Sequence, residues 1–323
     1  MAKPYFEPKI GYAVACQGVT KRFGTNTIAV SKLNLNVNYG TLFGIIGADG
    51  SGKTTLLRMI ATLLVPSEGI ISLLGKDVVK DFRYLRHCIG YMPGRFSLYP
   101  DLTVRENLNV FATLYQTSVE ENYDLICDIY DQRAPFAHRP AGKLSGGMKQ
   151  KLALCCALVH RPRVLLLDEP TTGVDPVARK VFWDILSRLS KEESLTILVS
   201  TPYMDEAFRC DEVALMQQGA IVDAGTPQSL VDRYPQKLYA AYSADKGHLL
   251  QFLGQLPYIR SAYSFGDSIH FTYNEHELPL SEVETVLRSE GFTDISTKEI
   301  LPGIEDYFLY KTDKSTKQRK GTI

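Results

Sequence analysis

The sequence predicts an α/β fold in which a glycine-rich loop joins a buried strand of a parallel sheet to a helix. Residues 41–46 are apolar, residues 47–54 form the glycine-rich loop, and apolar residues then recur at helical spacing until Pro66. Residues 164–168 form a second apolar run, which is followed by two carboxylates at its end. Residues 196–201 form a third such run. Buried strands that alternate with helices are typical of an α/β core.

Composition narrows the classes of protein to which the chain can belong. Its 323 residues suffice for about two domains, and 36 basic residues balance 36 acidic ones, so nothing argues for a nucleic-acid partner. The six cysteines show no C-x-x-C spacing and lie mostly in apolar runs, which indicates buried, reduced thiols and a cytoplasmic location. The N-terminus lacks the apolar core of a signal peptide, and no stretch approaches the ~20 apolar residues that span a bilayer. We therefore expect a chain that is soluble alone and reaches a membrane only through a partner.

The loop at residues 47–54 matches the Walker A pattern G-x-x-x-x-G-K-[ST] at every fixed position. Its glycines let successive backbone N–H groups converge on one anion, and the helix N-terminus adds further donors. Lys53 is predicted to reach the β- and γ-phosphates of a nucleotide, and Thr54 to hold Mg²⁺. The alternative is a glycine turn that matches the pattern by chance, and such a turn would not require a strand before it and a helix after it. The predicted nucleotide contacts here are Gly47, Asp49, Gly50, Gly52, Lys53, Thr54 and Thr55.

Phe23 lies just before the first predicted turn, between strands at residues 14–19 and 28–37. A lone Phe is most often a small core contact. Its place upstream of the glycine-rich loop also suits an aromatic platform for a nucleotide base. The residues around it leave both interpretations open.

Residues 101–143 are predicted to be mainly helical and to carry no chemistry of their own. A helix begins near Thr103, with Asp101 or Thr103 as its N-cap and Glu106 as a capping-box partner. Four aromatic residues in and before this segment are either core or a docking surface for another protein: Phe96, Tyr99, Phe111 and Tyr115.

A second anion-binding motif is predicted at residues 144–151. Ser145, Gly146 and Gly147 stand at the start of an apolar helix, where a hydroxyl and backbone N–H groups face an anion. A serine N-cap is common, so this motif alone is weak.

The apolar run at residues 164–168 has the Walker B form of four apolar residues and an aspartate. Asp168 is therefore predicted to bind Mg²⁺, and Glu169 to polarise the attacking water as general base. A polar turn that contains Asp175 then leads into a helix at residues 177–189. A strand that merely ends at surface acids would not pair with a Walker A loop. Further strands are predicted at residues 69–75, 89–93, 213–216 and 220–222.

With these motifs in order, the first ~230 residues resemble the ATP-binding cassette (ABC) ATPase family. The resemblance implies a RecA-like P-loop NTPase core with a helical subdomain at about 101–160. It also implies a head-to-tail dimer of two cassettes, in which ATP and Mg²⁺ lie between one subunit's Walker A loop and the other's signature residues Ser145, Gly146 and Gly147. Phe23 then becomes the adenine-stacking residue and Asp175 the D-loop residue. Such cassettes drive a membrane permease, so the chain is expected at the inner face of a membrane, in contact with it through residues 94–99 and the helices that follow.

The C-terminal part changes in pattern near Tyr239. Strands are predicted at residues 238–242, 259–265, 269–273 and 293–297, with helices at 247–253 and 280–290. This order suggests a small ferredoxin-like α+β module. Residues 302–308 resemble the ending of drug-resistance exporter ATPases of the daunorubicin type. We expect a nucleotide-binding domain at residues 1–232, an accessory domain at 233–310 and a mobile basic tail at 311–323, which is a weak candidate contact for anionic lipid.

Two positions depart from the family pattern. The family has a Gln where this chain has Gly94, and a His that contacts the γ-phosphate where it has Pro202. A positioned proton-transfer or hydrogen-bonding group contributes about 10²–10⁴ in rate, so hydrolysis at this chain's own Walker site is expected to be slow. Asp49, where Asn is usual, adds a carboxylate near the phosphates.

Because the signature residues are intact, we hypothesise that the chain pairs with a different cassette, completes that cassette's site through Ser145 and holds ATP in its own slower site. The competing interpretation is that Arg95, Thr201 or Tyr203 replaces the missing groups and that the site is ordinary.

The function favoured by these observations is the ATP-hydrolysing subunit of an ABC transporter, specifically an exporter. An importer cassette is one alternative. A soluble ABC-type ATPase that acts on ribosomes or DNA is another, although such forms usually carry two cassettes or long coiled-coil insertions. A slow or non-hydrolysing regulatory cassette is the third, and it is motivated by Gly94 and Pro202.

Overall fold

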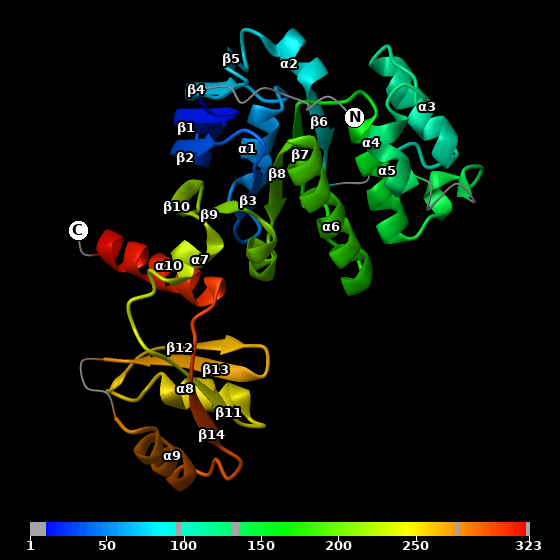
Figure 1. The fold of residues 1–323 in the computed structure, drawn as a ribbon. Helices are drawn as coiled ribbons and strands as arrows, with labels where there is room; N and C mark the ends of the chain where they lie inside the picture. Colours follow the sequence, from blue (N-terminus) through cyan, green and yellow to red (C-terminus); the bar gives the residue numbers. More distant parts are fainter. Residues whose placement is uncertain (1–10, 95–97, 131–135, 275–277, 321–323) are drawn as a thin grey trace. The chain divides into compact units, whose positions relative to one another are not determined.

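The computed structural model describes residues 11–94, 98–130, 136–274 and 278–320 (Figure 1). The chain divides into two compact units, the first formed by Met1–Leu230 together with Ser315–Ile323 and the second by Val231–Lys314, and each unit is described by itself. In the described part of the chain, no helix combines the length and the apolar character needed to cross a bilayer.

The first unit contains a six-stranded sheet in the order β10-β9-β3-β8-β7-β6. Strands β3, β6, β7, β8 and β9 pair in parallel, and β10 pairs antiparallel with β9. Every residue of β3, β7 and β8 is buried, as expected for parallel strands covered on both faces. The predicted α/β fold is confirmed. The bounds are β3 Leu42–Ile46, β6 Ile89–Met92, β7 Val164–Asp168, β8 Thr196–Thr201, β9 Glu212–Gln217 and β10 Ala220–Gly225.

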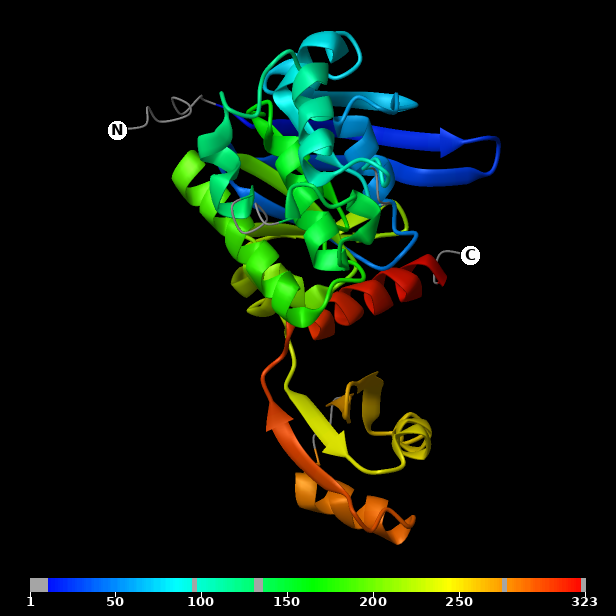
Figure 2. The same cartoon turned by 90° about the vertical axis from the view of Figure 1, so that its right-hand side faces the viewer.

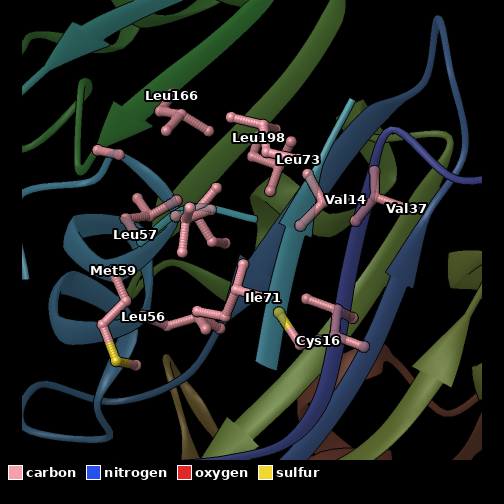
Figure 3. Packing of buried hydrophobic residues seen from close by; sticks show 14 of the residues in the cluster. Val14, Cys16, Val37, Leu56, Leu57, Met59, Ile71, Leu73, Leu166 and Leu198 are labelled. Carbon is pink, nitrogen blue, oxygen red and sulfur yellow. The ribbon is translucent and has the colours of Figure 1, made fainter. Parts of the chain in front are cut away.

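A second sheet of the same unit has the order β2-β1-β4-β5, and all its pairs are antiparallel. Helix α1 (Lys53–Ile60) lies between the two sheets. Its side chains Leu56, Leu57 and Met59 pack in one cluster with Ile71 of β4 and Leu166 of β7 (Figure 3). Truncating a buried leucine typically costs about 2–5 kcal/mol, so this packing holds the loop before α1 firmly. The bounds are β1 Val14–Phe23, β2 Thr27–Val37, β4 Glu68–Leu73 and β5 Lys76–Asp77.

Helix α1 ends earlier than its apolar spacing predicts. The spacing continues to Leu64, but the helix stops at Ile60. Thr62 adopts the left-handed conformation with φ of 62°, which an α-helix excludes. The backbone N–H groups of Leu63 and Leu64 both donate to the Arg58 carbonyl instead.

A helical segment follows β6 along the chain, and α6 follows β7 (Figures 1 and 2).

The predicted capping box is confirmed: Thr103 is the N-cap of α3, and its side chain and that of Glu106 each bond to the other's backbone N–H. Of the four aromatic residues, Tyr99 is exposed, Phe111 and Tyr115 are half-buried, and Phe96 lies outside the described residues. The helices are α2 Phe82–Cys88, α3 Val104–Leu114, α4 Tyr123–Tyr130, α5 Gly146–Leu158, α6 Pro176–Glu193 and α7 Pro227–Val231, with short 3-10 turns at η2 Ala141–Lys143 and η3 Met204–Arg209.

His160 connects the helical segment to the six-stranded sheet. Its ring stacks on Tyr115 at 3.6 Å between centroids, and its Nε2 lies 3.0 Å from the carbonyl oxygen of Ile89 in β6. Burial lowers the pKa of His160 from 6.5 to about 4, against the raising effect of the Ile89 contact, and the nearby His87 lowers it further. The folded chain therefore holds this imidazole neutral at pH 7.

This shift predicts a pH dependence of stability. Between pH 6.5 and pH 4 the unfolded chain binds a proton at His160 that the folded chain does not, so the free energy of unfolding falls as the pH falls. The expected loss from this group is about 3 kcal/mol between pH 7 and pH 4. Urea unfolding at both pH values, compared with His160→Gln, measures it, because the variant lacks the titrating group. Equal pH dependence in both proteins would contradict the assignment.

The second unit is a four-stranded antiparallel sheet in the order β12-β13-β11-β14. The chain order of strand, helix, two strands, helix and strand, with this sheet order, is the split βαβ arrangement of the predicted ferredoxin-like module. Strand β14 begins at Ser296, three residues after the predicted start, because Thr293 and Asp294 form a turn in which Asp294 accepts from Ser243 and Ala244. The bounds are β11 Leu238–Tyr242, α8 Lys246–Leu253, β12 Ile259–Phe265, β13 Ser268–Tyr273, α9 Leu280–Ser289 and β14 Ser296–Ile300.

The last described element is helix α10, Ile304–Lys320. Residues 311–320, part of the expected mobile basic tail, are helical, and no helix was predicted there. No glycine or proline lies between residues 304 and 320, and the charged residues of the tail are good helix formers. The helix is attached to β13 by His270, whose Nδ1 lies 2.7 Å from Oδ1 of Asp306.

Candidate functional site

The glycine-rich loop runs from the end of β3 to the start of α1, and its shape requires glycine at two positions. A Cβ at Gly47 would lie 2.1 Å from the Met216 carbonyl oxygen, and a Cβ at Gly52 would lie 2.3 Å from that of Ala29. Gly52 also has φ of 108°, which favours glycine strongly. The loop is therefore held close to the backbone of β2 and β9, with its N–H groups at the start of α1.

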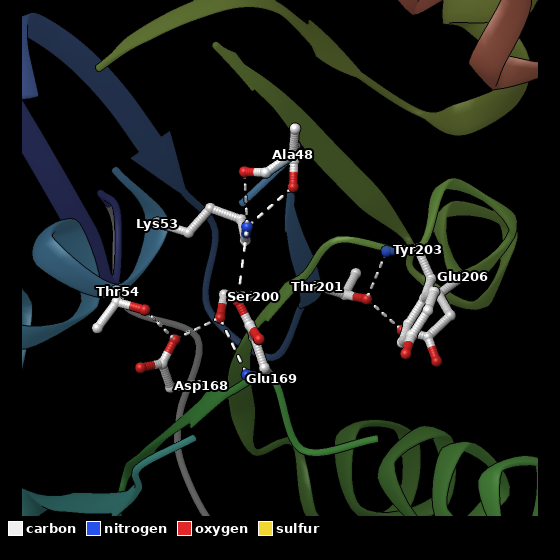
Figure 4. Close-up of polar contacts among 10 residues, drawn as sticks. Ala48, Lys53, Thr54, Asp168, Glu169, Ser200, Thr201, Tyr203 and Glu206 are labelled. Atoms are coloured by element: carbon white, nitrogen blue, oxygen red, sulfur yellow. Dashed lines mark hydrogen bonds and ion pairs between the residues drawn. The ribbon is translucent and has the colours of Figure 1, made fainter. Parts of the chain in front are cut away.

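Lys53 is the first residue of α1, at the end of this loop, and is only 3% exposed. Its ammonium donates to the carbonyl oxygens of Gly47 at 2.8 Å and Ala48 at 3.1 Å. It also lies 3.6 Å from Oε1 of Glu169 (Figure 4). A buried ammonium beside a helix N-terminus is suited to binding a polyanion.

Ser51 provides a test of whether the loop fits a phosphate. Its hydroxyl is buried and has no hydrogen-bond partner among the described residues. Buried polar groups are normally paired, so an unpaired hydroxyl in an anion-binding loop fits a phosphate oxygen as its partner.

Asp49 and Gly50 are exposed at the tip of the loop, and Thr55 is half-buried in the first turn of α1.

The Walker B aspartate lies directly beside the loop. Oδ1 of Asp168 accepts hydrogen bonds from Thr54 at 2.9 Å and from Ser200 at 2.7 Å (Figure 4). A hydroxyl and a carboxylate are hard oxygen ligands of the kind Mg²⁺ prefers, so Thr54 and Asp168 fit a magnesium site.

Ser200 was not among the predicted site residues. It lies directly opposite Asp168 in the β7–β8 register, and its hydroxyl and carbonyl oxygens both accept from the Glu169 backbone N–H, at 3.1 and 3.0 Å. The sequence signal was a hydroxyl at the carboxyl end of a strand, but the pairing with Asp168 depends on which strands are neighbours.

Glu169 follows β7 in the left-handed conformation, with φ of 50°. The two bonds from its N–H to Ser200 support this conformation, which costs about 1–3 kcal/mol for a residue other than glycine. Its side chain is 25% exposed and lies on the same side as Lys53. A carboxylate held at the mouth of an anion site, beside a metal-ligand pair, is placed to accept a proton from water.

Phe23 ends β1 and is 43% exposed. Lys21 lies over its ring at 5.3 Å from the centroid. The exposure excludes the core interpretation and leaves Phe23 accessible in the same unit as the loop.

The signature residues contact the start of α6. Ser145 is the N-cap of α5 and accepts from the Met148 N–H. A Cβ at Gly147 would lie 2.7 Å from Cβ of Ala178, and one at Gly146 would lie 3.4 Å from the carbonyl oxygen of Gly173. Asp175 accepts from the Ala178 N–H at 2.9 Å as the N-cap of α6.

Of the two unusual positions, Gly94 lies beside Asp168. A Cβ at Gly94 would lie 3.1 Å from the carbonyl oxygen of Asp168 and 3.8 Å from its carboxyl carbon. Pro202 directly follows β8, two residues after Ser200. A side chain at position 94 would therefore begin close to the metal-ligand pair.

Two of the proposed substitutes for the missing groups contact residues outside the predicted motifs. Thr201 donates its hydroxyl to Glu206 (Figure 4). The Tyr203 ring lies 4.4 Å from the Arg179 guanidinium. Arg95 lies outside the described residues.

A family model described as "ABC transporter" matches residues 30–172. Relatives include "Probable multidrug ABC transporter ATP-binding protein YbhF" of Escherichia coli, 38% identical over 301 residues, which cover 92% of this chain and 51% of that protein. The chain thus spans about half the length of this relative. "Nod factor export ATP-binding protein I" of Sinorhizobium fredii is 33% identical over 96% of this chain and 88% of its own length.

Solved structures show the same likeness. cbiO1 from Clostridium perfringens, part of the ABC transporter complex cbiONQ, has a TM-score of 0.62 at 26% identity and covers 69% of this chain and 92% of its own. The ATP-binding cassette MJ0796, in a dimeric post-hydrolysis state bound to ADP and Pi, has a TM-score of 0.60 at 26% identity over 66% of this chain and 98% of its own.

Proposed function

This chain belongs to the ABC transporter family, and from that premise we propose that it is an ATP-hydrolysing subunit that drives a membrane permease. The observation that carries the proposal is the convergence of Lys53, Thr54, Asp168 and Glu169 at one loop. The domain boundaries proposed are a nucleotide-binding domain at 1–232, an accessory domain at 233–310 and a tail from 311.

The loop and Lys53 bind and orient the triphosphate of ATP, with Phe23 stacked on the adenine. Thr54 and Asp168 would hold Mg²⁺, which neutralises charge that develops on the phosphates. Ser200 orients Asp168 through its 2.7 Å hydrogen bond. Glu169 accepts the proton of the attacking water, and the rigid turn at its own backbone fixes where its carboxylate points.

A second cassette completes the site with its own Ser145, Gly146 and Gly147. The dimeric structure of the similar cassette MJ0796, bound to ADP and Pi, supports this arrangement. Because the signature residues pack on the start of α6, Asp175 would face the junction of the two subunits.

The direction of transport that we propose is export. The relatives named for multidrug transport and Nod factor export support this choice, and the daunorubicin-type ending at residues 302–308 is the finer proposal. The chain would sit at the cytoplasmic face of the inner membrane through its permease. A pocket of about 380 Å³ between α3 and α4, lined by Leu108, Val119, Tyr123 and Tyr130 among others, supports the helical segment as the side that meets a partner.

Binding is tested first with Lys53→Ala. The variant loses charged hydrogen bonds to phosphate, so the affinity for MgATP is expected to fall about 10–10²-fold in calorimetric titration. Lys76→Ala in β5 is the matched control, because it removes an ammonium that is 44% exposed and pairs with Asp81 instead of the loop. An unchanged affinity in Lys53→Ala would show that the nucleotide binds elsewhere.

A second candidate function is a slow or regulatory cassette in a heterodimer, and Gly94 and Pro202 favour it specifically. The purified chain alone is then expected to bind MgATP tightly but to release phosphate slowly. Fast, Glu169-dependent hydrolysis by the isolated homodimer would refute this candidate and leave the ordinary hydrolytic subunit.

Ser200→Ala is expected to raise the Mg²⁺ concentration needed for half-maximal turnover about tenfold, since residues that orient metal ligands typically contribute 10–100-fold in metal affinity. The measurement is ATP turnover against Mg²⁺ at fixed ATP. Ser190→Ala is the control, because its buried hydroxyl donates to the Gly40 carbonyl oxygen on another part of the fold. An unaltered Mg²⁺ requirement would mean that Asp168 needs no support from β8.

A further inference from the structure

Glu206 is a buried carboxylate that none of the predicted motifs includes. It lies in η3 and is 2% exposed. Its Oε1 accepts from Thr171 at 2.8 Å and from the Trp183 indole at 3.0 Å, and its Oε2 accepts from Thr201 at 2.5 Å. The Arg179 guanidinium lies 3.7 Å from Oε1. Both oxygens act as acceptors, which is the hydrogen-bonding pattern of an ionised carboxylate.

The donors come from three segments that adjoin the nucleotide site. Thr171 lies two residues after Glu169, on the way to Asp175. Thr201 ends β8, and Trp183 lies on α6, which begins at the signature contact. One carboxylate thus joins the strand beside the metal ligands, the segment after the general base and the helix that meets the signature residues.

The last two residues of β8 each donate a hydrogen bond to a carboxylate. Successive strand residues point to opposite faces, so Ser200 bonds to Asp168 while Thr201 bonds to Glu206. Both β8 residues are fully buried. A shift of Thr201 away from Glu206 would therefore move Ser200, and with it Asp168 and the Glu169 N–H.

A contribution to stability does not by itself explain why a carboxylate is buried at position 206. Replacing a buried ion pair by apolar residues is often neutral or stabilising, so a carboxylate here is a weak device for holding the fold. Its hydrogen bonds are directional and fix the relative positions of three segments. From this placement we infer that Glu206 is a positioning residue that couples the ATP site to the start of α6, an inference that rests on the proposed ATPase function.

The test uses Glu206→Gln in the full chain, which keeps the shape of the side chain. The amide nitrogen must face either Thr201, whose oxygen already accepts from the Tyr203 N–H, or the two donors at Oε1. Single-turnover ATP hydrolysis is expected to slow about tenfold, a change of about 1.4 kcal/mol in activation free energy, with MgATP affinity within about twofold of wild type. Turnover that stays within about twofold would overturn the inference.

Trp183 supplies a second readout, because it is the only tryptophan of the chain and bonds to Glu206 directly. Its emission is expected to change when MgATP binds to the wild type, and to lose at least half of that change in Glu206→Gln. An equal response in both proteins would overturn the inference, since a residue that serves only the fold would not carry the signal.

Thr171→Val and Thr201→Val keep the inference testable if Glu206→Gln folds poorly. Thr201→Val and Glu206→Gln both alter the Thr201–Glu206 contact, so the double variant should be no slower than the slower single variant, and additive effects would count against the coupling. Ser190→Ala lies on α6, as Trp183 does, and should retain wild-type turnover even if its melting temperature falls. A fall in its turnover equal to that of Glu206→Gln would also overturn the inference. If the wild type fails to bind MgATP, the proposed function fails; if it binds and hydrolyses normally while Glu206→Gln does the same, only this inference fails.

Discussion

Replacement of Glu169 by glutamine is expected to lower ATP turnover about 10²–10⁴-fold while MgATP binding is retained. The amide keeps the shape of the side chain and the backbone bonds to Ser200, but it cannot accept the proton of water. The variant also loses the 3.6 Å pair with Lys53, which is partly exposed and worth about 0.2–1 kcal/mol, so the affinity for MgATP should change less than about fivefold. Phosphate release under single-turnover conditions and calorimetric binding measure the two quantities.

Glu192→Gln is the matched control for this experiment, because Glu192 is exposed near the end of α6, far along the helix from Asp175. Its turnover should equal that of the wild type. If Glu169→Gln retained full turnover, another group would be the base, and the role assigned to Glu169 would be wrong. If both turnover and binding were lost, the substitution would have disturbed the loop, and the Lys53 contact would be the feature to re-examine.

The parts of the site that the sequence predicts are those formed within one short segment. The loop at residues 47–54 and the two acids at 168 and 169 follow strands directly, so local pattern and position along the chain are sufficient to assign them. The capping box at Thr103 is local in the same sense, and the structure has it as predicted.

Features that depend on which strands are neighbours could not be predicted from the sequence. Ser200 bonds to Asp168 because β8 lies next to β7, although 32 residues separate them. Glu206 gathers donors from Thr171, Trp183 and Thr201, which no spacing in the sequence brings together. The exposure of Phe23 likewise depends on how β1 packs, since a strand that ends in Phe fits a core equally well.

The helical structure of the C-terminal residues was also not predicted, for a different reason. Residues 311–320 are polar and basic, a composition that favours a solvated, mobile chain end. Helix formation depends instead on the absence of glycine and proline and on anchoring at the first turn. Ile304 and Tyr307 are buried and Asp306 contacts His270, so α10 begins from a fixed turn.

The double variant Gly94→Gln with Pro202→His is expected to raise turnover at the chain's own site at least about 10²-fold, because each restored group contributes about 10²–10⁴ in rate when it is well positioned. A side chain at position 94 starts 3.8 Å from the Asp168 carboxyl carbon. A side chain at position 202 starts two residues beyond Ser200. Phosphate release by the isolated chain at saturating MgATP is the measurement.

Gly94→Ala with Pro202→Ala is the control, because it makes the same changes in backbone freedom without adding a polar group. Position 94 tolerates a Cβ only if the Asp168 carbonyl oxygen, 3.1 Å away, moves by a few tenths of an ångström, so both double variants carry the same small strain. A rise confined to the Gln and His variant would establish that the chain's own site is slow for want of these two groups. Equal turnover in both double variants, with MgATP binding retained, would mean that Tyr203 or another side chain already supplies them when ATP is bound.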